Sequence, residues 1–446
     1  MMDKERLLEL VEKKQYVQLK NELSLMNEVD IAEFLDPLDP NTTLLIFRML
    51  PKDLAVEVFA HFSPEQQSSI VHSATDKELS HILEELFFDD MIDMIEEMPA
   101  NLVKKILKNS NPEERQLINQ FLKYPVDSAG SIMTIEYVDL KKDMTVREAM
   151  DHIRETGLTK ETIYTCYVTD SNRILEGIVS LRELVVSDED LRLADIMEDE
   201  VIYVNTHDDR ETVGNLFIKY GFMALPVVDN ENRLTGIITF DDILDVIEQE
   251  ATEDFQIMAA MAPSEERYID TKVIDLAKQR IPWLLVLMIG ATITGRIISN
   301  FENLLSRLVV LTAFIPMLMD TGGNSGNQSS TLVIRGLATG DIELEDKWNI
   351  LWKEFRIGII SGLILGSVNF LKNMLIDRVG LLVSLTVSIT LVVCVIVAKI
   401  IGSMLPLGAK KLKLDPAIMA GPLITTLVDA ITLTIYFAMA TFLLKL

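Results

Sequence analysis

The sequence predicts a multidomain membrane protein with an all-α helical-repeat domain, a tandem pair of α+β units and a five-helix α-helical transmembrane domain. Long apolar segments are confined to the C-terminal part, a helical repeat occupies the N-terminal part, and a strand–turn–strand pattern occurs twice between them. The N-terminal residues, MMDKERLLELVEKK, predict a charged amphipathic helix and not a signal peptide. The predicted divisions are 1–127 (helical repeat), 128–250 (α+β pair), 240–275 (acidic connecting segment) and 276–446 (transmembrane domain).

Charge separates the chain into two unlike halves. Residues 263–446 hold 14 Asp and Glu against 17 Lys and Arg, whereas residues 1–262 hold 54 against 24, out of 68 and 41 in the whole chain. The N-terminal half therefore has a net charge of −30, which argues against nucleic acid and favours cations as partners. The two cysteines lie in different halves, so no disulfide framework is predicted and a reducing cytoplasm suits the acidic half.

The helical part shows an internal repeat at an offset of 48 residues, in which LDPNTTLLIFRMLP (38–51) aligns with LFFDDMIDMIEEMP (86–99). Apolar residues at helical spacing, with proline near the helix starts, predict stacked helical hairpins. The second copy carries acids where the first does not, and Asp89 and Asp93 share one helix face. Like charges at this spacing repel, so a cation bound between the two carboxylates would reduce their electrostatic repulsion. The alternative is that these acids form a solvated face.

The second repeat has an offset of 59 residues and pairs YVTDSNRILEGIVSLREL (167–184) with PVVDNENRLTGIITFDDI (226–243). Each copy predicts a strand, a polar turn, a second strand and a helix opened by Ser180 or Thr239. This pattern resembles a tandem pair of CBS domains, which implies a nucleotide site. The resemblance assigns that site to Phe222, Thr239 and Asp242; a purely scaffolding pair is the alternative.

The segment that follows, 240–263, has apolar residues at a spacing of 3.6 and predicts a single helix. Its other faces carry seven acids and no base within residues 240–254. The acidic side chains of such a helix repel one another. The helix directly precedes the predicted membrane domain, which it could contact. The alternative is that its acids form the solvated face of a linker.

Hydropathy predicts five spans of about 20 residues or somewhat more. They cover residues 282–298, 308–334, 355–376, 381–405 and 417–444. With the acidic half in the cytoplasm, the inner flanks carry eleven basic residues and the outer flanks five, in agreement with the positive-inside tendency. The inner ones are Arg267, Lys272, Lys278, Arg280, Arg335, Lys347, Lys353, Arg356, Lys410, Lys411 and Lys413. This orientation puts the N-terminal domains in the cytoplasm of a multi-pass plasma-membrane protein and the C-terminus outside.

A polar stretch, PMLMDTGGNSGNQSS (316–330), interrupts the second span. Lipid offers no hydrogen-bond partners, so polar groups at this depth must be buried in protein or line a wet pathway. We expect an unwound backbone here, with unusual dihedral angles at the glycines. The predicted pore-lining residues are Gly322, Gly323, Asn324, Asn327 and Gln328. Asp429, the one acid deep in the last span, is the predicted ion-binding carboxylate of the pore.

Taken over its whole length, the chain resembles the MgtE family of magnesium transporters and channels. The motifs that carry the resemblance are GGNSGNQ, the EATED of residues 250–254, and DPAIMAGPLITTLVD (415–429). The resemblance implies a homodimer whose pore runs between two membrane domains and closes when cytosolic Mg²⁺ is high. Gly421 and Gly221 stand where other members carry an asparagine and an acid.

The predicted function is the passive import of Mg²⁺, with the bilayer, hydrated divalent cations and a second copy of the chain as partners. The expected metal-binding acids are Asp89, Asp93, Asp209, Glu211, Asp242, Asp245, Glu250, Glu253, Asp254, Asp415 and Asp429. ATP is the candidate nucleotide. The alternatives are a less selective transporter of Co²⁺ or Ni²⁺, because oxygen ligands discriminate poorly between hydrated divalents, and a membrane-anchored CBS nucleotide sensor. No motif for catalysis is found, so an enzyme is not expected.

Overall fold

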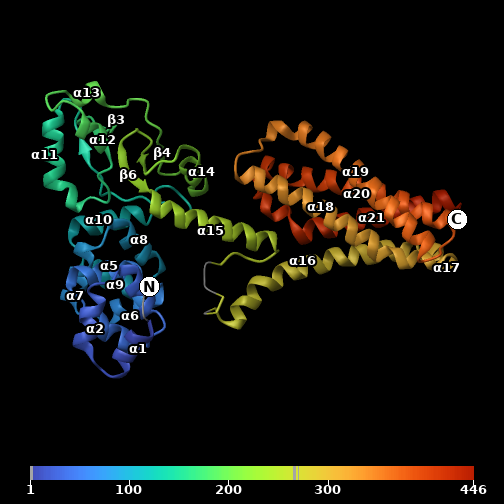
Figure 1. Cartoon of the computed structure of the whole chain (residues 1–446), viewed down its shortest axis with the longest axis horizontal. Helices are drawn as coiled ribbons and strands as arrows, with labels where there is room; N and C mark the ends of the chain where they lie inside the picture. Colours follow the sequence, from blue (N-terminus) through green and yellow to red (C-terminus); the bar gives the residue numbers. More distant parts are fainter. Residues whose placement is uncertain (1–3, 265–267, 270, 446) are drawn as a thin grey trace. The chain divides into compact units, whose positions relative to one another are not determined.

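The computed structural model describes residues 4–264, 268–269 and 271–445 (Figure 1). It divides into two compact units, Met1–Val246 and Ile247–Leu446. Arg267, one of the basic residues of the predicted inner flanks, lies outside the described residues.

The first unit begins with ten short helices, in agreement with the predicted helical repeat. Prolines 40, 64 and 112 stand at the first helical position, where a missing N–H costs nothing. Apolar side chains on the inner faces, such as Phe59 and Leu79, are fully buried. The helices are α1 (Lys4–Glu12), α2 (Tyr16–Leu23), α3 (Glu28–Leu35), α4 (Pro40–Phe47), α5 (Lys52–Ala60), α6 (Pro64–Ser73), α7 (Asp76–Glu85), α8 (Phe88–Glu97), α9 (Ala100–Asn109) and α10 (Pro112–Phe121).

Two small sheets follow, and they confirm the duplicated α+β pattern. Strand order is β1-β2-β3 in the first sheet and β4-β5-β6 in the second; in each, the first pair is parallel and the second antiparallel. The first copy has an additional 3-10 turn, η1 (Gly157–Thr159), in the region where it is longer than the second copy. The elements are β1 (Asp139–Leu140), α11 (Val146–Thr156), β2 (Thr165–Thr169), β3 (Leu175–Ser180), α12 (Leu181–Val186), α13 (Leu193–Ile196), β4 (Val204–Asn205), α14 (Arg210–Tyr220), β5 (Ala224–Val228) and β6 (Leu234–Thr239).

Helix α15 (Phe240–Met258) is the predicted connecting helix, but it ends five residues earlier than expected. Ala260 has a φ of 54°, and the N–H of Met261 donates to the carbonyl of Gln256 at 2.9 Å. A left-handed residue followed by such a bond closes a helix in a Schellman-type turn. The sequence pattern missed this end because alanine is not a usual left-handed residue.

The second unit contains the long C-terminal helices. Four helical segments of the described residues are long and apolar enough to cross a membrane: Val273–Asn300, Leu344–Leu375, Leu381–Lys411 and Pro416–Leu444. Helix α18, with its polar stretch, is not among these four. The elements are α16 (Val273–Asn300), α17 (Glu302–Arg307), η2 (Val309–Phe314), α18 (Ile315–Ala338), η3 (Leu344–Asp346), α19 (Lys347–Leu375), α20 (Leu381–Lys411), η4 (Pro416–Met419) and α21 (Gly421–Leu444).

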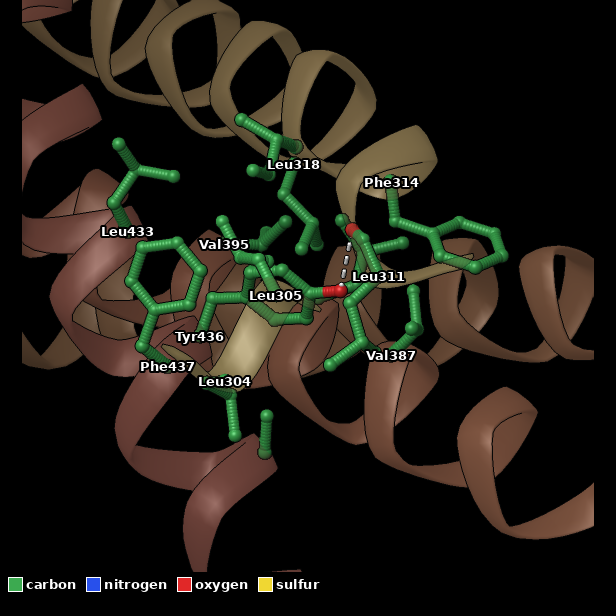
Figure 2. Close-up of a cluster of buried hydrophobic side chains, with 13 residues drawn as sticks. Leu304, Leu305, Leu311, Phe314, Leu318, Val387, Val395, Leu433, Tyr436 and Phe437 are labelled. Carbon is green, nitrogen blue, oxygen red and sulfur yellow. Dashed lines mark hydrogen bonds between the residues drawn. The ribbon is translucent and has the colours of Figure 1, made fainter. Parts of the chain in front are cut away.

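One end of this bundle has an apolar core in which α17, η2 and α18 meet α20 and α21 (Figure 2). Tyr436 is fully buried there and donates its hydroxyl to the carbonyl of Leu311 at 2.9 Å, the dashed line in Figure 2. This bond satisfies a tyrosine hydroxyl that burial would otherwise leave without a partner. The core fixes the start of α18 against α21, the two helices that carry the candidate pore residues.

Helices α18 and α20 approach so closely that glycine is required at the contact. A Cβ atom added to Gly402 would lie 2.1 Å from the carbonyl oxygen of Gly326. Small residues at such contacts let helix backbones pack closely within a membrane. A backbone oxygen cannot move aside alone, so a larger residue would have to separate the two helices.

We therefore expect Gly402→Ala to destabilise the transmembrane domain by about 1–3 kcal/mol, the usual cost of overpacking a core. Gly408→Ala in the same helix is the matched control, since nothing lies within 4 Å of its added Cβ. The measurement is the unfolding midpoint of each variant in detergent. Equal midpoints would contradict the close packing of α18 and α20.

Candidate functional site

A polar stripe runs along one face of α18. Asp320, Asn324 and Gln328 are spaced four apart and exposed, whereas Gly322 and Gly323 on the other side are buried. A stripe of polar side chains is not stable against lipid, so it must face protein or water. The stripe is therefore the part of the membrane domain best suited to line an ion path.

The expectation of an unwound backbone in this stretch is wrong. Residues 315–338 form one continuous α-helix, and the described glycines with positive φ are Gly221, Gly340 and Gly421. A Cβ on Gly322 would lie 2.8 Å from Thr432 Oγ1, and one on Gly323 would lie 2.8 Å from Thr425 Cγ2. These glycines thus serve close packing of α18 on α21, not a break in α18, because helix contacts outweigh the low helix propensity of glycine.

Asp429 lies on α21, half-buried, and Asp320 of α18 is its charged neighbour. Its Oδ1 atom is buried and has no hydrogen-bond partner among the described residues. Two carboxylates of like sign therefore lie near each other where α18 meets α21. A carboxylate oxygen left unpaired in such a place costs free energy that a cation would recover.

Other polar residues of α18 position neighbouring segments. The side-chain Oδ1 of Asn327 accepts a 3.0 Å hydrogen bond from the backbone N–H of Gly421, and the Ser330 hydroxyl donates to the backbone carbonyl of Met419 at 3.1 Å. Asn327 thus holds the N-terminus of α21, in addition to any role in lining the pore. No sequence signal identified this contact, which joins residues 94 positions apart.

The structure explains the glycine at position 421. Its φ is 41°, and an added Cβ would lie 2.6 Å from the carbonyl oxygen of Met258 at the end of α15. An asparagine here would collide with that oxygen. Nearby, Ile257 and Met258 pack against Ile334, Ala417 and Ala420. The end of α15 therefore contacts the junction from which α21 starts.

Charged residues accompany this contact. Burial raises the pKa of Asp254 to about 6, and the charges of Asp415 and Glu250 add to the shift. Asp415, one of the expected metal-binding acids, caps η4 and accepts a hydrogen bond from the N–H of Ala417 at 2.7 Å. These three acids form the α15-end group, defined as Glu250, Asp254 and Asp415.

A larger group of acids lies in the first unit, where α8 meets the start of α15. Burial, followed by the charges of Asp242 and Asp90, holds the pKa of Asp89 well above its ordinary range. Desolvation by the surrounding chain raises the pKa of Asp93 and that of Glu161 to about 7 each, and the charges of Asp90 and Asp242 add to both shifts. We call this the α8–α15 acid cluster, and its members are Asp89, Asp90, Asp93, Glu136, Glu161, Asp241, Asp242 and Asp245.

The cluster includes acids that sequence analysis did not select. Asp90 is one of the acids that the second copy of the repeat gains, and Asp241 is one of the seven acids of the connecting segment, but neither is among the expected ligands. Glu136 and Glu161 join the cluster through tertiary contacts that no repeat or spacing indicates. Among the described residues, no three His, Cys, Asp or Glu side chains form a group that could hold a metal directly. The cluster is therefore a concentration of negative charge suited to a hydrated cation, and its residues do not form a preformed coordination shell.

The remaining predicted site residues are distributed as follows. Asp209 caps α14 and accepts from the N–H of Glu211 at 2.9 Å, so this pair is placed at a helix start. Gly221, with a φ of 68°, ends the same helix. The Thr239 hydroxyl donates to Asp242, and Phe222 stacks on Tyr220 just before β5, whose Ala224 pairs with Thr239. The three nucleotide candidates thus lie at one end of the second sheet, and Asp242 is common to this end and the acid cluster.

The raised pKa values predict how the α8–α15 acid cluster responds to pH. In the unfolded chain these carboxyl groups have their ordinary pKa of about 4, and in the folded chain the pKa values are about 6 to 7. Between these two pH values the folded state binds more protons than the unfolded state, so its stability falls as pH rises. Without divalent cation, the local stability of α8 should therefore fall as pH rises from 5 to 7 and then level off. Hydrogen exchange of residues 88–97 at several pH values measures this.

Added Mg²⁺ should restore protection at pH 7.5 and have little effect at pH 5. Asp93→Asn should flatten the pH dependence, whereas Asp30→Asn, which changes an exposed acid outside the cluster, is the control. Protection that rises with pH in the parent chain would show that the cluster carries no such repulsion.

The fold and the site together define a class of protein: a helical membrane transport protein that also carries an acidic helical-repeat domain and a pair of small α+β units. Known family models agree with this. A model described as divalent cation transporter matches residues 315–439, one described as MgtE intracellular N domain matches 26–127, and CBS domain models match 129–189 and 193–249.

Curated relatives extend over nearly the whole chain. The magnesium transporter MgtE of Thermus thermophilus is 37% identical over 431 residues, 96% of this chain and 95% of that protein. The one from Bacillus subtilis is 32% identical over 92% of this chain and 93% of its own length. The chain belongs to the MgtE family.

Two solved structures resemble the soluble part. The soluble part of a magnesium transporter is 31% identical with a TM-score of 0.52 and covers 56% of this chain and 98% of its own. The cytosolic domain of the Mg²⁺ channel MgtE in complex with ATP is 37% identical with a TM-score of 0.51 and covers 54% and 98%. Both confirm the helical domain followed by a CBS pair.

Proposed function

We propose that this chain passes Mg²⁺ into the cytoplasm down its electrochemical gradient and that cytosolic Mg²⁺ closes the path. The observation that carries the proposal is Asp429, a carboxylate inside the membrane domain with an unpaired buried oxygen beside the polar stripe of α18. The relatives named as magnesium transporters support Mg²⁺ as the ion.

Magnesium chemistry suits this arrangement. Mg²⁺ demands octahedral oxygen at about 2.0–2.1 Å and loses its waters reluctantly. A path lined by carboxylate and amide oxygens can bind the hydrated ion through its water shell, so that selectivity depends on cavity size and hydration. Asp429 supplies the charge, and Asn324 and Gln328 supply amide groups along α18.

A homodimer would complete the path. The α18 stripe is exposed in one copy, and only 6% of the apolar window of α16 is buried. A second copy would bring a second Asp429 to the opposite wall of the path, and an isologous pair is the commonest way to do so. We also propose five spans, with α18 as the second, cytoplasmic N-terminal domains and an outer C-terminus, as the distribution of basic residues favours.

Regulation is proposed to act through the two acidic groups. Mg²⁺ bound at the α8–α15 acid cluster and at the α15-end group would neutralise acids at both ends of one continuous helix, α15. Glu253 lies on the same helix, and Asp209 and Glu211 add charge to the CBS pair. Since Met258 contacts Gly421, fixing α15 would fix the start of α21, the helix that carries Asp429.

ATP is proposed as a second ligand of the soluble unit. Phe222, Thr239 and Asp242 lie together, which suits a base-stacking ring and a ribose-binding hydroxyl and carboxylate. The solved MgtE cytosolic domain that contains ATP supports this. Because Asp242 also belongs to the acid cluster, nucleotide and Mg²⁺ would influence each other's binding.

Ion flux into liposomes that contain the purified full chain tests the proposal. Mg²⁺ should enter along an imposed gradient without an energy source, and internal Mg²⁺ should slow it. Faster entry of Co²⁺ or Ni²⁺ than of Mg²⁺ would favour the less selective transporter. Absence of flux of any divalent, together with ATP binding, would favour the membrane-anchored nucleotide sensor.

A further inference from the structure

A hollow of about 800 Å³, lined by both polar and apolar side chains, opens between α18, α19 and α20. The side of α18 that bears Asn324 and Gln328 forms one wall, and α19 and α20 form the others. Apolar Leu332 and Ile357 also line it, so the hollow combines a polar interior with groups suited to a lipid chain.

Two charged side chains of opposite sign line this hollow. Glu354 of α19 is 8% exposed and Lys399 of α20 is 6% exposed. Ser329 donates to Glu354 Oε2 at 2.6 Å. Lys399 has no hydrogen bond or ion pair among the described residues, so its ammonium lies beyond 4.0 Å from the Glu354 carboxylate.

Lys399 and Glu354 line the same hollow, and ionisable side chains at membrane depth are costly by default. Glu354 accepts one hydrogen bond, from the hydroxyl of Ser329, and Lys399 makes none among the described residues. A ligand that carries both a cation and an anion could pair with both side chains at once.

The surroundings place the hollow near a membrane surface. Trp348 and Trp352 at the start of α19 are exposed, and the guanidinium of Arg356 lies 5.8 Å from the Trp352 ring centroid. Tryptophan and arginine in such positions mark the headgroup level of a bilayer. Glu354 lies between these residues in the chain but is buried, which places the hollow beside lipid headgroups.

We propose that the hollow binds the headgroup of an aminophospholipid, with the phosphate at Lys399 and the primary ammonium at Glu354. A choline headgroup has a cation but no N–H to donate to the carboxylate, and a glycerol headgroup has no cation, so neither can give Glu354 a charge-assisted hydrogen bond. A bound headgroup would also contact the polar wall of α18, and lipid composition would thereby influence the helix that lines the path.

Mass spectrometry of the intact protein in detergent tests this. The full chain is titrated with phosphatidylethanolamine, phosphatidylcholine and phosphatidylglycerol, and bound lipid is counted. Phosphatidylethanolamine should bind about tenfold more tightly than the other two, as expected for one additional charge-assisted hydrogen bond. Glu354→Gln should remove this preference, and Lys399→Gln should weaken all three lipids about tenfold.

Lys353→Gln is the matched control, because Lys353 is exposed next to Glu354 and should leave binding unchanged. Circular dichroism confirms that each variant is folded. Equal binding of the three lipids, binding unaffected by both hollow variants, or equally tight binding of soluble phosphoethanolamine would each overturn the proposal. Because the readout is bound mass, its failure is distinguishable from a failure of Mg²⁺ transport.

Discussion

Asp429→Ala is expected to reduce Mg²⁺ flux at least about a hundredfold, the effect of losing roughly 3 kcal/mol of charge contact with the passing ion. The reason is the position of this carboxylate: it lies half-buried on α21, near Asp320, with one oxygen that no described group satisfies. Flux of Mg²⁺ into liposomes, measured with an entrapped indicator, gives the result.

Two further variants sharpen this prediction. Asp429→Asn keeps the shape but removes the charge, so it should lose flux nearly as completely as alanine. Asp377→Asn is the control, because Asp377 lies outside the helices and pairs with Lys372 at 2.6 Å. If purified and folded Asp429→Asn conducts like the parent, the ion path does not depend on this carboxylate.

The double variant Glu253→Ala with Asp254→Ala is expected to conduct but to resist closure by internal Mg²⁺. Asp254 belongs to the α15-end group, where burial and the charges of Asp415 and Glu250 make the ionised form costly without a cation. A bound ion supplies attraction that alanine cannot replace, so bridging should be lost. Moving a gate from mostly open to mostly closed takes about 5.5 kcal/mol of differential binding, so a partial loss has a large effect.

Patch recordings at stepped internal Mg²⁺ measure this. Glu248→Gln is the control, since Glu248 is an exposed acid on the same helix. The double variant should need at least about tenfold more Mg²⁺ to close, equivalent to 1.4 kcal/mol. If the double variant closes at the same Mg²⁺ concentration as the parent, these acids do not sense Mg²⁺ and only form a solvated surface.

The parts of the candidate site that the sequence can indicate are those whose signals are local. The four-residue spacing of Asp89 and Asp93 places them on one face of α8, where Asp89 is buried, Asp93 is exposed, and both belong to the acid cluster. The run of polar residues at 316–330 indicated the helix that carries the exposed stripe of Asp320, Asn324 and Gln328. What failed was the local backbone: asparagine and glycine favour breaks in isolation, but packing of Gly322 and Gly323 on α21 keeps the helix continuous.

The sequence by itself determined the domain classes, the two internal repeats, the excess of acids before the membrane helices and the lone carboxylate of the last one. These depend on periodicity, composition and hydropathy, which act between residues near in the chain. Only the tertiary structure brought Glu161 to Asp242, Met258 to Gly421 and Glu354 into one hollow with Lys399. Such contacts join distant segments whose proximity follows from the packing of whole helices and sheets, and no local pattern encodes it.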